Sequence, residues 1–394
     1  MKTQTTKSNS VPDPDVDLWV CAGQSNMAGA GLLPARQRTD PGITMYMDDG
    51  VWLTAQEPVS RIFRHPPKAF SNFMIPVWGQ KAWDDNMAME KKRVFGGVGP
   101  SLAFARHVRR HTGRRIGLIP CALGATGMSH WSPDLLKDGK DSLYGNMIAR
   151  IREVGGNIKG LLWYQGEGET NPGLQDSFEK TWLDFVDAVR RDTGIADLPV
   201  LYVQISRYCL DTDPDYALKW EQIRDRQRTA AGKRPNLQVV PAIDLPLDDL
   251  IHIGTEGHQR LGKRLAEVAL GTVYRLPGHA SPIDFESAEV LPSMDYLHNT
   301  MRVRFRGVSG RLQSAGRASG FSLRSAEPRK DGPTVFKVEF DPKDPAAAIL
   351  WVSKTIEKPI SLYYGAGLDP YCNIVDSKDM AVPAFGPIPI RPRK

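Results

Sequence analysis

Five apolar runs, each bounded by Gly, Pro or polar residues, recur along the first 276 positions. They cover residues 17–22, 116–122, 159–164, 199–205 and 237–243. Each run is nearly continuous rather than alternating, which predicts a strand covered on both faces. Helical spacing of apolar residues follows at 101–109, 174–190 and 256–270. Strands and helices in alternation predict a doubly wound α/β fold, a three-layer sandwich around a five-stranded parallel sheet.

The pattern changes near Pro277. Beyond it, short runs at 301–305, 335–340 and 360–364 alternate apolar and polar residues between turn residues, without helical spacing. This predicts a small C-terminal antiparallel β domain. The predicted organisation is a disordered N-terminal segment (1–16), an α/β domain (17–276) with a long, weakly patterned insertion (35–95) that shapes a pocket or a subunit contact, and a β-rich domain (277–390).

The composition and charge of the chain narrow the classes of function that are expected. The 394 residues are 41% hydrophobic and 24% charged, as in ordinary globular proteins. The net charge of +6 is spread along the chain, so no nucleic-acid partner is expected. The four cysteines lie far apart, which predicts buried free thiols and neither a zinc site nor a disulfide framework. Because no signal peptide or membrane-length run is present, we expect a chain without membrane contact, cytoplasmic unless a leader was removed.

Ser25 stands where the first predicted strand ends, in the stretch VCAGQSNMAG (20–29). In a doubly wound sheet, ligands bind at the carboxyl ends of the strands. A serine there suits a nucleophile whose own backbone N–H helps to bind an oxyanion. The alternative is that Ser25 only caps a helix.

A serine nucleophile needs a base, and the base needs an orienting acceptor. Asp249 and His252 lie three apart in the loop after the fifth predicted strand, at the same edge of the sheet. Alone, such a pair is commonly a surface cap, but together with Ser25 it predicts a Ser-His-Asp triad. Asp248 is an alternative orienting carboxylate with a less suitable spacing.

Two further strand ends could supply oxyanion donors. Gly124 follows the second strand and could expose a backbone N–H, although a glycine there could also serve only close packing. Gln165 follows the third strand, and its side-chain amide could reach the same position. Phosphate binding is disfavoured, because neither GxxxxGK[ST] nor a strand-linked GxGxxG occurs.

With these residues identified, the chain resembles the SGNH (GDSL-like) hydrolases, and more closely the sialate O-acetylesterase and carbohydrate esterase family 6 group. Five blocks carry the resemblance in the family's order: GQSNM (23–27), GVGPSLAFA (97–105), GAT (124–126) with Trp131, WYQGE (163–167) and DLIH (249–252). Similarity extends over about residues 17–387. One departure is GAT, where the family usually has Gly-Gly-Thr.

The resemblance implies a serine esterase that removes O-acetyl groups from carbohydrates, either sialic acids or polysaccharides, without metal or cofactor. Ser25 would be the nucleophile, His252 the base and Asp249 its orienting acid. The Ser25 amide, Gly124 and Gln165 would bind the oxyanion. Substrate contacts are expected from the remaining motif residues, Gln24, Asn26, Trp131 and Glu167.

Two other functions stay open. The first is a catalytically silent carbohydrate-binding protein on the same fold. The second is a lipase or thioesterase, which would want a long apolar channel, whereas the aromatic residues near the predicted site suit stacking on a sugar ring. The sequence does not indicate an oligomeric state.

Overall fold

The computed structural model describes residues 15–60, 68–90, 96–171, 173–210, 214–292, 299–325 and 332–393. Most of the N-terminal segment predicted to be disordered, residues 1–14, lies outside this range. Val16, which that prediction also included, already belongs to the first strand. In the described part of the chain, no helix combines the length and the apolar character needed to cross a membrane.

A seven-stranded sheet forms the centre of the N-terminal part, with the order β3-β2-β4-β1-β5-β6-β7. The five predicted strands are β1 (Val16–Gly23), β4 (Arg115–Pro120), β5 (Asn157–Tyr164), β6 (Val200–Gln204) and β7 (Leu237–Pro241). All five pair in parallel.

The predicted strand number was too low. The insertion adds β2 (Ile43–Tyr46), parallel to β4, and β3 (Trp52–Thr54), antiparallel to β2 at the edge. Both strands are short, and β3 is only half-buried, so neither shows the continuous apolar run of a central strand.

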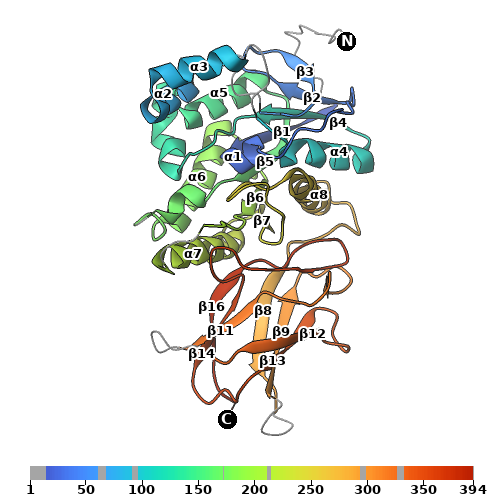
Figure 1. Ribbon diagram of the computed structural model, residues 1–394. Helices are drawn as coiled ribbons and strands as arrows, with labels where there is room; N and C mark the ends of the chain where they lie inside the picture. The colour runs from blue at the N-terminus through green and yellow to red at the C-terminus, as the bar shows by residue number, and fades with distance from the viewer. Residues whose placement is uncertain are drawn as a thin grey trace.

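Helices cover both faces of this sheet (Figure 1). On one face, α4 (Pro100–Thr112) packs against α8 (Thr255–Thr272), and Phe104 of α4 meets Trp19 of β1 edge-on with ring centroids 4.7 Å apart. On the other face, Trp182 and Phe185 of α6 (Phe178–Thr193) pack against Trp163 of β5. The large aromatic residues of the core therefore hold the layers together on each side.

The remaining helices were indicated more weakly by the spacing of apolar residues in the sequence. They are the single turn α1 (Ser25–Ala28), α2 (Lys68–Trp78), α3 (Gln80–Glu90), α5 (Leu143–Val154) and α7 (Pro214–Ala230). Short 3₁₀ helices span Met128–Trp131, Pro133–Asp141, Glu167–Thr170 and Ala231–Lys233. Helix α7 lacks a clean apolar stripe because it buries the polar residues Glu221, Arg224 and Gln227 beside Trp220 and Ile223.

The C-terminal part is antiparallel, as predicted. One sheet has the order β12-β13-β9-β8, a second β11-β14-β16, and β10 pairs with β15. The strands are β8 (Asp284–Val290), β9 (Asn299–Arg306), β10 (Gln313–Ser314), β11 (Phe321–Ser325), β12 (Val335–Phe340), β13 (Ala347–Val352), β14 (Ile360–Tyr364), β15 (Ile374–Val375) and β16 (Phe385–Ile390). A domain boundary near residue 277 remains a prediction.

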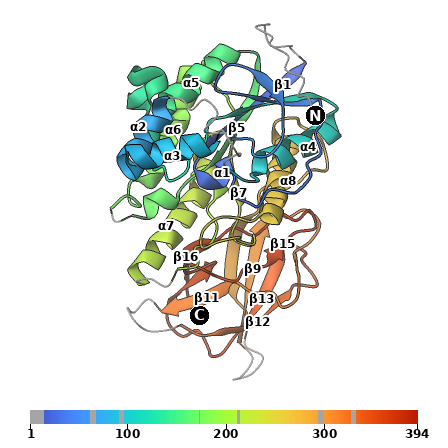
Figure 2. The ribbon, with the colours of Figure 1, turned by 45° about the horizontal axis from the view of Figure 1, so that its top comes forward.

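These strands gather at one end of the molecule, beside β7 and α7 (Figures 1 and 2). Two buried side chains tie the parts together. Gln204 of β6 donates to the carbonyl of Ala384 and accepts from its N–H, both at 2.8 Å. Arg224 of α7 donates to the carbonyls of Gly365, Gly367 and Leu368. Buried polar groups of the α/β part are thus satisfied by the C-terminal part.

Candidate active site

Ser25 opens α1 directly beyond the carboxyl end of β1. Gly23 makes the preceding turn at φ 127°, and a Cβ there would come within 2.2 Å of the Tyr164 carbonyl oxygen of β5. Only glycine fits this approach. The Gln24 N–H donates to the same carbonyl at 2.8 Å, which fixes the turn and leaves Ser25 half-buried at the sheet edge.

His252 reaches Ser25 from the loop between β7 and α8. Its Nε2 lies 2.9 Å from Ser25 Oγ, and its Nδ1 lies 2.7 Å from Oδ2 of Asp249. A carboxylate can only accept, so Nδ1 carries the proton and Nε2 is left to accept from the serine hydroxyl. The three side chains therefore form one directed chain of hydrogen bonds.

Asp249 is held by its own loop. Its Oδ1 accepts from the N–H groups of Ile251 at 2.8 Å and His252 at 2.7 Å. Partial burial acts to raise the pKa of Asp249, but these bonds and the His252 ring outweigh it and lower the pKa below the ordinary value. The carboxylate stays ionised at neutral pH, as an acceptor for an imidazole must.

Asp248, the alternative, faces elsewhere. Its carboxylate lies against Gly254, where an added Cβ would come within 2.2 Å of Oδ1, and Oδ2 accepts from the Leu32 N–H at 3.4 Å. The hydrogen bond to His252 is made by Asp249.

A second histidine, His258, lies close enough to His252 to interact with it electrostatically. His258 of α8 is fully buried, and neither ring nitrogen has a hydrogen-bond partner among the described residues. Burial lowers the pKa of His258 to about 3, with a smaller contribution from His252 in the same direction. His258 is therefore neutral at working pH.

Asn26 joins three loops at the site. Its Nδ2 donates to Oε1 of Glu167 at 3.1 Å and to the Ile251 carbonyl at 3.3 Å, and its Oδ1 accepts from the Ile253 N–H at 3.0 Å. Asn26 is 1% exposed. It was predicted to contact substrate, but its polar atoms are used internally, where they hold the His252 loop against α1.

Glu167 and Gln24 are also buried. Burial raises the pKa of Glu167, while the hydrogen bond from Asn26 and the nearby His252 act in the opposite direction. As placed, both residues support the loops around Ser25 rather than presenting a side chain to solvent. Their predicted substrate contacts are not supported by this geometry.

Of the predicted oxyanion donors, Gly124 lies beside the serine and Gln165 is engaged elsewhere. A Cβ on Gly124 would contact Ser25 Cβ at 3.4 Å, so the glycine backbone borders the reacting oxygen. Gln165 is fully buried, and its Nε2 donates to Oε1 of Glu169 at 3.1 Å and to the Thr126 carbonyl at 3.4 Å. With both amide hydrogens used, Gln165 has none left for an oxyanion.

Glu169, which holds Gln165, was missed by the sequence reading. Its Oε1 also accepts from the Met128 N–H at 2.6 Å. Burial raises the pKa of Glu169, and the bonds from Met128 and Gln165 oppose this. The available signal in the sequence was the repeated Gly-Glu of residues 166–169. An acidic side chain that is buried in a strand-end loop needs hydrogen-bond donors from neighbouring loops.

Trp131 is not available for stacking on a sugar, which corrects the prediction. The side chain is 0% exposed, its ring meets Trp163 edge-on at 5.2 Å, and its Nε1 donates to Oγ1 of Thr126 at 3.0 Å. It belongs to the core under the loop that carries Gly124. His130 and Phe73, which are partly exposed, lie with their rings 4.5 Å apart.

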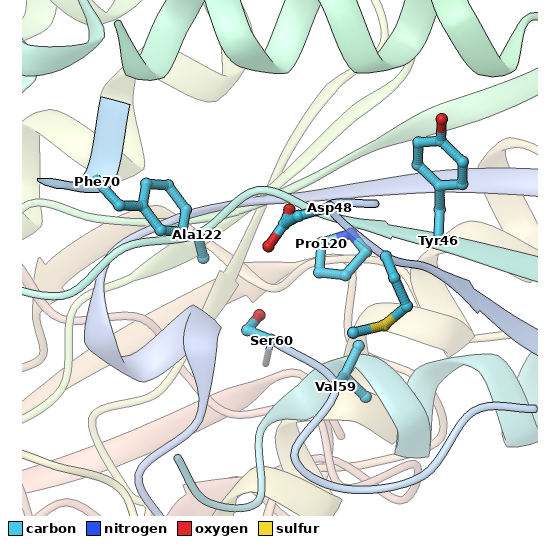
Figure 3. A pocket seen from close by; sticks show the side chains of 8 residues that line it. Tyr46, Asp48, Val59, Ser60, Phe70, Pro120 and Ala122 are labelled. Atoms are coloured by element: carbon cyan, nitrogen blue, oxygen red, sulfur yellow. The ribbon is translucent and has the colours of Figure 1, made fainter. Parts of the chain in front are cut away.

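A small pocket opens along the same sheet edge, between the ends of β2 and β4 (Figure 3). Tyr46 and Pro120 end those strands, and the insertion supplies further lining, including Ser60 and Phe70. Buried Arg150 of α5 pairs with Asp48 of this lining and donates to the Tyr46 carbonyl at 2.7 Å. Residues of the insertion thus line most of this pocket, while a role of the insertion in function stays a prediction.

Comparisons with known proteins identify the family of the chain. Residues 15–271 match the model of a family described as carbohydrate esterase, sialic acid-specific acetylesterase. An Arabidopsis thaliana protein named as a probable carbohydrate esterase is 27% identical over 282 residues, 66% of this chain and 92% of that protein. Its X-ray structure covers the same share of this chain and all of that chain, with a TM-score of 0.50 and 26% identity.

The crystal structure of XAC1771, a carbohydrate acetylesterase from Xanthomonas citri, covers 94% of this chain and 80% of that chain, with a TM-score of 0.66 and 19% identity. At this identity the match shows a shared fold. Its coverage takes in C-terminal strands as well as the α/β part.

Proposed function

Because this chain belongs to the carbohydrate esterase family of sialic acid-specific acetylesterases, we propose that it hydrolyses O-acetyl esters of carbohydrates with Ser25 as nucleophile, His252 as general base and Asp249 as its orienting acid. The observation that carries the proposal is the directed chain from Ser25 Oγ through His252 to Asp249, with 2.9 and 2.7 Å contacts. Such an order of hydroxyl, imidazole and carboxylate is what activates a serine at neutral pH.

The reaction proceeds in two acyl transfers. Ser25 Oγ attacks the acetyl carbonyl carbon while His252 Nε2 takes the hydroxyl proton, and the carbonyl oxygen becomes an oxyanion. His252 then gives the proton to the sugar oxygen as the C–O bond breaks, leaving an acetyl-enzyme. Water, deprotonated by His252, attacks this ester, and acetate leaves as Ser25 regains its proton.

The oxyanion is proposed to lie between the N–H groups of Ser25 and Gly124. As the first residue of α1, Ser25 has no partner for its N–H within the helix. Gly124 borders the serine from the loop after β4. Backbone donors fixed in this way stabilise a developing negative charge without rearranging, which is worth roughly a 100- to 1000-fold rate factor per donor.

The proposed substrates are acetylated sialic acids or acetylated polysaccharides. The family supports an acetylated carbohydrate, and the sugar itself is to be found by assay. A panel of O-acetylated sialic acids, acetylated xylan and p-nitrophenyl acetate separates these choices by kcat/KM.

The test compares the wild type with Ser25→Ala and His252→Ala, following acetate release. Both variants should lose about 10⁴-fold or more in kcat, with circular dichroism unchanged. Ser129→Ala, an exposed serine in the loop carrying Gly124, is the matched control and should keep its activity. Activity that survives Ser25→Ala would overturn the serine mechanism.

A catalytically silent carbohydrate-binding protein is the alternative. It would show sugar binding by calorimetry with no acetate release from any ester of the panel. The geometry favours catalysis, since a binding protein has no use for a serine hydroxyl aligned on a histidine.

A further inference from the structure

A cluster of histidines around one glutamate lies on the face covered by α4 and α8. His107 and His111 are one helical turn apart on α4, and Glu267 projects from α8. Nε2 of His107 lies 2.7 Å from Oε1 of Glu267. The rings of His107 and His111 have centroids 4.4 Å apart. One ligand atom from each of these three residues lies within 4.8 Å of the other two.

We propose that His107, His111 and Glu267 bind one divalent transition-metal ion of the zinc class. Imidazole nitrogens and a carboxylate oxygen are the ligands that zinc, nickel and copper ions prefer. Zinc sites have metal–ligand distances of about 2.0–2.2 Å, so their ligand atoms stand roughly 3.3 Å apart. The three ligand atoms already lie within 4.8 Å of one another, so they have to approach by no more than about 1.5 Å to reach that spacing.

The protonation pattern leaves ligand atoms available. Nδ1 of His111 donates to the His107 carbonyl at 2.9 Å, which leaves Nε2 of His111 with its lone pair. Nε2 of His107 now shares a proton with Glu267. Metal binding replaces that proton, which moves to Nδ1 or leaves to solvent.

An outer shell holds the carboxylate. Oε2 of Glu267 accepts from Nδ1 of His279 at 3.1 Å and from the Ala280 N–H at 3.2 Å. Outer-shell partners of this kind orient ligands and tune metal affinity.

Helices α4 and α8, which carry the three proposed ligands, pack closely against each other. At Gly262 a Cβ would come within 2.3 Å of the Pro100 carbonyl, so α8 and α4 pack with backbones in close approach. Glu267 lies twelve residues beyond Thr255, about 18 Å along α8 from the His252 loop. The proposed metal is therefore remote from Ser25 and structural, tying α4 and α8 to the segment that leads into β8.

No metal was predicted from the sequence, because His107 and Glu267 are 160 positions apart. Sequence motifs for metal sites depend on short spacings. Here only the His107–His111 spacing of one helical turn is local, and the carboxylate comes from packing.

The experiment uses the full chain with any affinity tag removed, stripped of metal by a chelator and titrated with Zn²⁺ in a calorimeter. We expect one equivalent bound with micromolar or tighter affinity, and a melting temperature that rises with Zn²⁺. His111→Ala changes an exposed residue and should weaken binding about tenfold or more. Glu267→Gln should do the same.

Two controls separate this site from others. His130→Ala, a histidine outside the cluster, should leave the Zn²⁺ affinity unchanged, and so should His252→Ala, which removes the histidine paired with Asp249. Esterase activity should not depend on the metal. The proposal fails if Zn²⁺ does not bind at micromolar concentration, if binding survives both His111→Ala and Glu267→Gln, or if His252→Ala abolishes it.

Discussion

Nε2 of His252 lies 2.9 Å from Oγ of Ser25, although 227 positions separate the two residues in the chain. β1 and β7 are three strand spacings apart in the sheet, about 14 Å. Residues 242–254 therefore have to return along the sheet edge, and the bond from the Ile253 N–H to Asn26 holds them there. The distance between His252 Nε2 and Ser25 Oγ therefore depends on the strand order of the whole sheet, and not on the α1 segment or the His252 loop alone.

Asp249→Asn should lower kcat by about 10²- to 10⁴-fold. An amide can present its own N–H to Nδ1 and so favour the wrong imidazole tautomer. The lower part of this range reflects the exposure of the Asp249 side chain, which is 54%. Asp248→Asn is the matched control and should change kcat far less. Steady-state kinetics on p-nitrophenyl acetate measure both, and equal losses would contradict the assignment.

Asn26→Ala should lower kcat about 10- to 100-fold with little change in KM. The variant removes two hydrogen bonds that hold the backbone of the His252 loop beside Ser25 and one to Glu167, so the reacting atoms lose their alignment. Asn171→Ala, which removes an exposed amide donating only to the Gly168 carbonyl, is the control. A raised KM with kcat retained would instead indicate the substrate contact predicted from the sequence.

Trp131→Phe should lower the melting temperature and leave KM for acetylated sugars unchanged. The ring is fully buried against Trp163, so the substitution leaves a cavity and removes the hydrogen bond from the indole to the Thr126 hydroxyl, which keeps its own bond to the Leu123 carbonyl, at a cost of about 1–3 kcal/mol. Thermal unfolding and sugar kinetics are measured together, with the partly exposed Trp351→Phe as control. A KM effect without loss of stability would return Trp131 to the binding site.

The free energy of unfolding should depend on pH through Glu57. Burial raises the pKa of Glu57 from 4.5 to about 7. A raised acidic pKa means that the folded state binds the proton more tightly, so the stabilisation is fully present below pH 4.5 and is lost as the pH rises through about 7. Relative to Glu57→Gln, the wild type should gain about 3 kcal/mol between pH 7.5 and 4.5.

Denaturant titrations across this pH range measure the effect. Glu256→Gln removes the same charge from an exposed position and controls for the change in net charge. Parallel stability curves for wild type and Glu57→Gln would contradict the prediction.

Much of the fold could be predicted because continuous apolar runs mark strands that are covered on both faces. All five central strands were found in this way, the antiparallel C-terminal part was found from its short alternating runs, and the family resemblance is confirmed by the match over residues 15–271. β2 and β3 were missed because runs of four and three residues are too short to show a pattern, and β3 is in addition a half-buried edge strand. Helix α7 was missed because its buried face carries Arg224 and Gln227.

At the candidate site, the residues expected to act together do lie together, while their roles stay a prediction. Ser25, Asp249 and His252 could be picked out because strand ends meet at one edge of a parallel sheet. The geometry does not support the roles predicted for Gln165 and Trp131, for a physical reason. Whether a side chain faces solvent or Glu169 and Trp163 depends on packing between loops, and sequence motifs do not report this.

The buried side chains of Arg224 and Gln204 also have a consequence for folding during synthesis. Three of the four carbonyls that accept hydrogen bonds from Arg224 belong to residues 365–368. The backbone of residue 384 supplies a hydrogen-bond acceptor and a donor for the side-chain amide of Gln204. During synthesis β6 and α7 emerge well before these partners, and a buried guanidinium or amide without partners is costly. The nascent α/β part therefore has to wait for the end of the chain, and a product cut short before residue 365 would carry Ser25, Asp249 and His252 without the packing that keeps them in place.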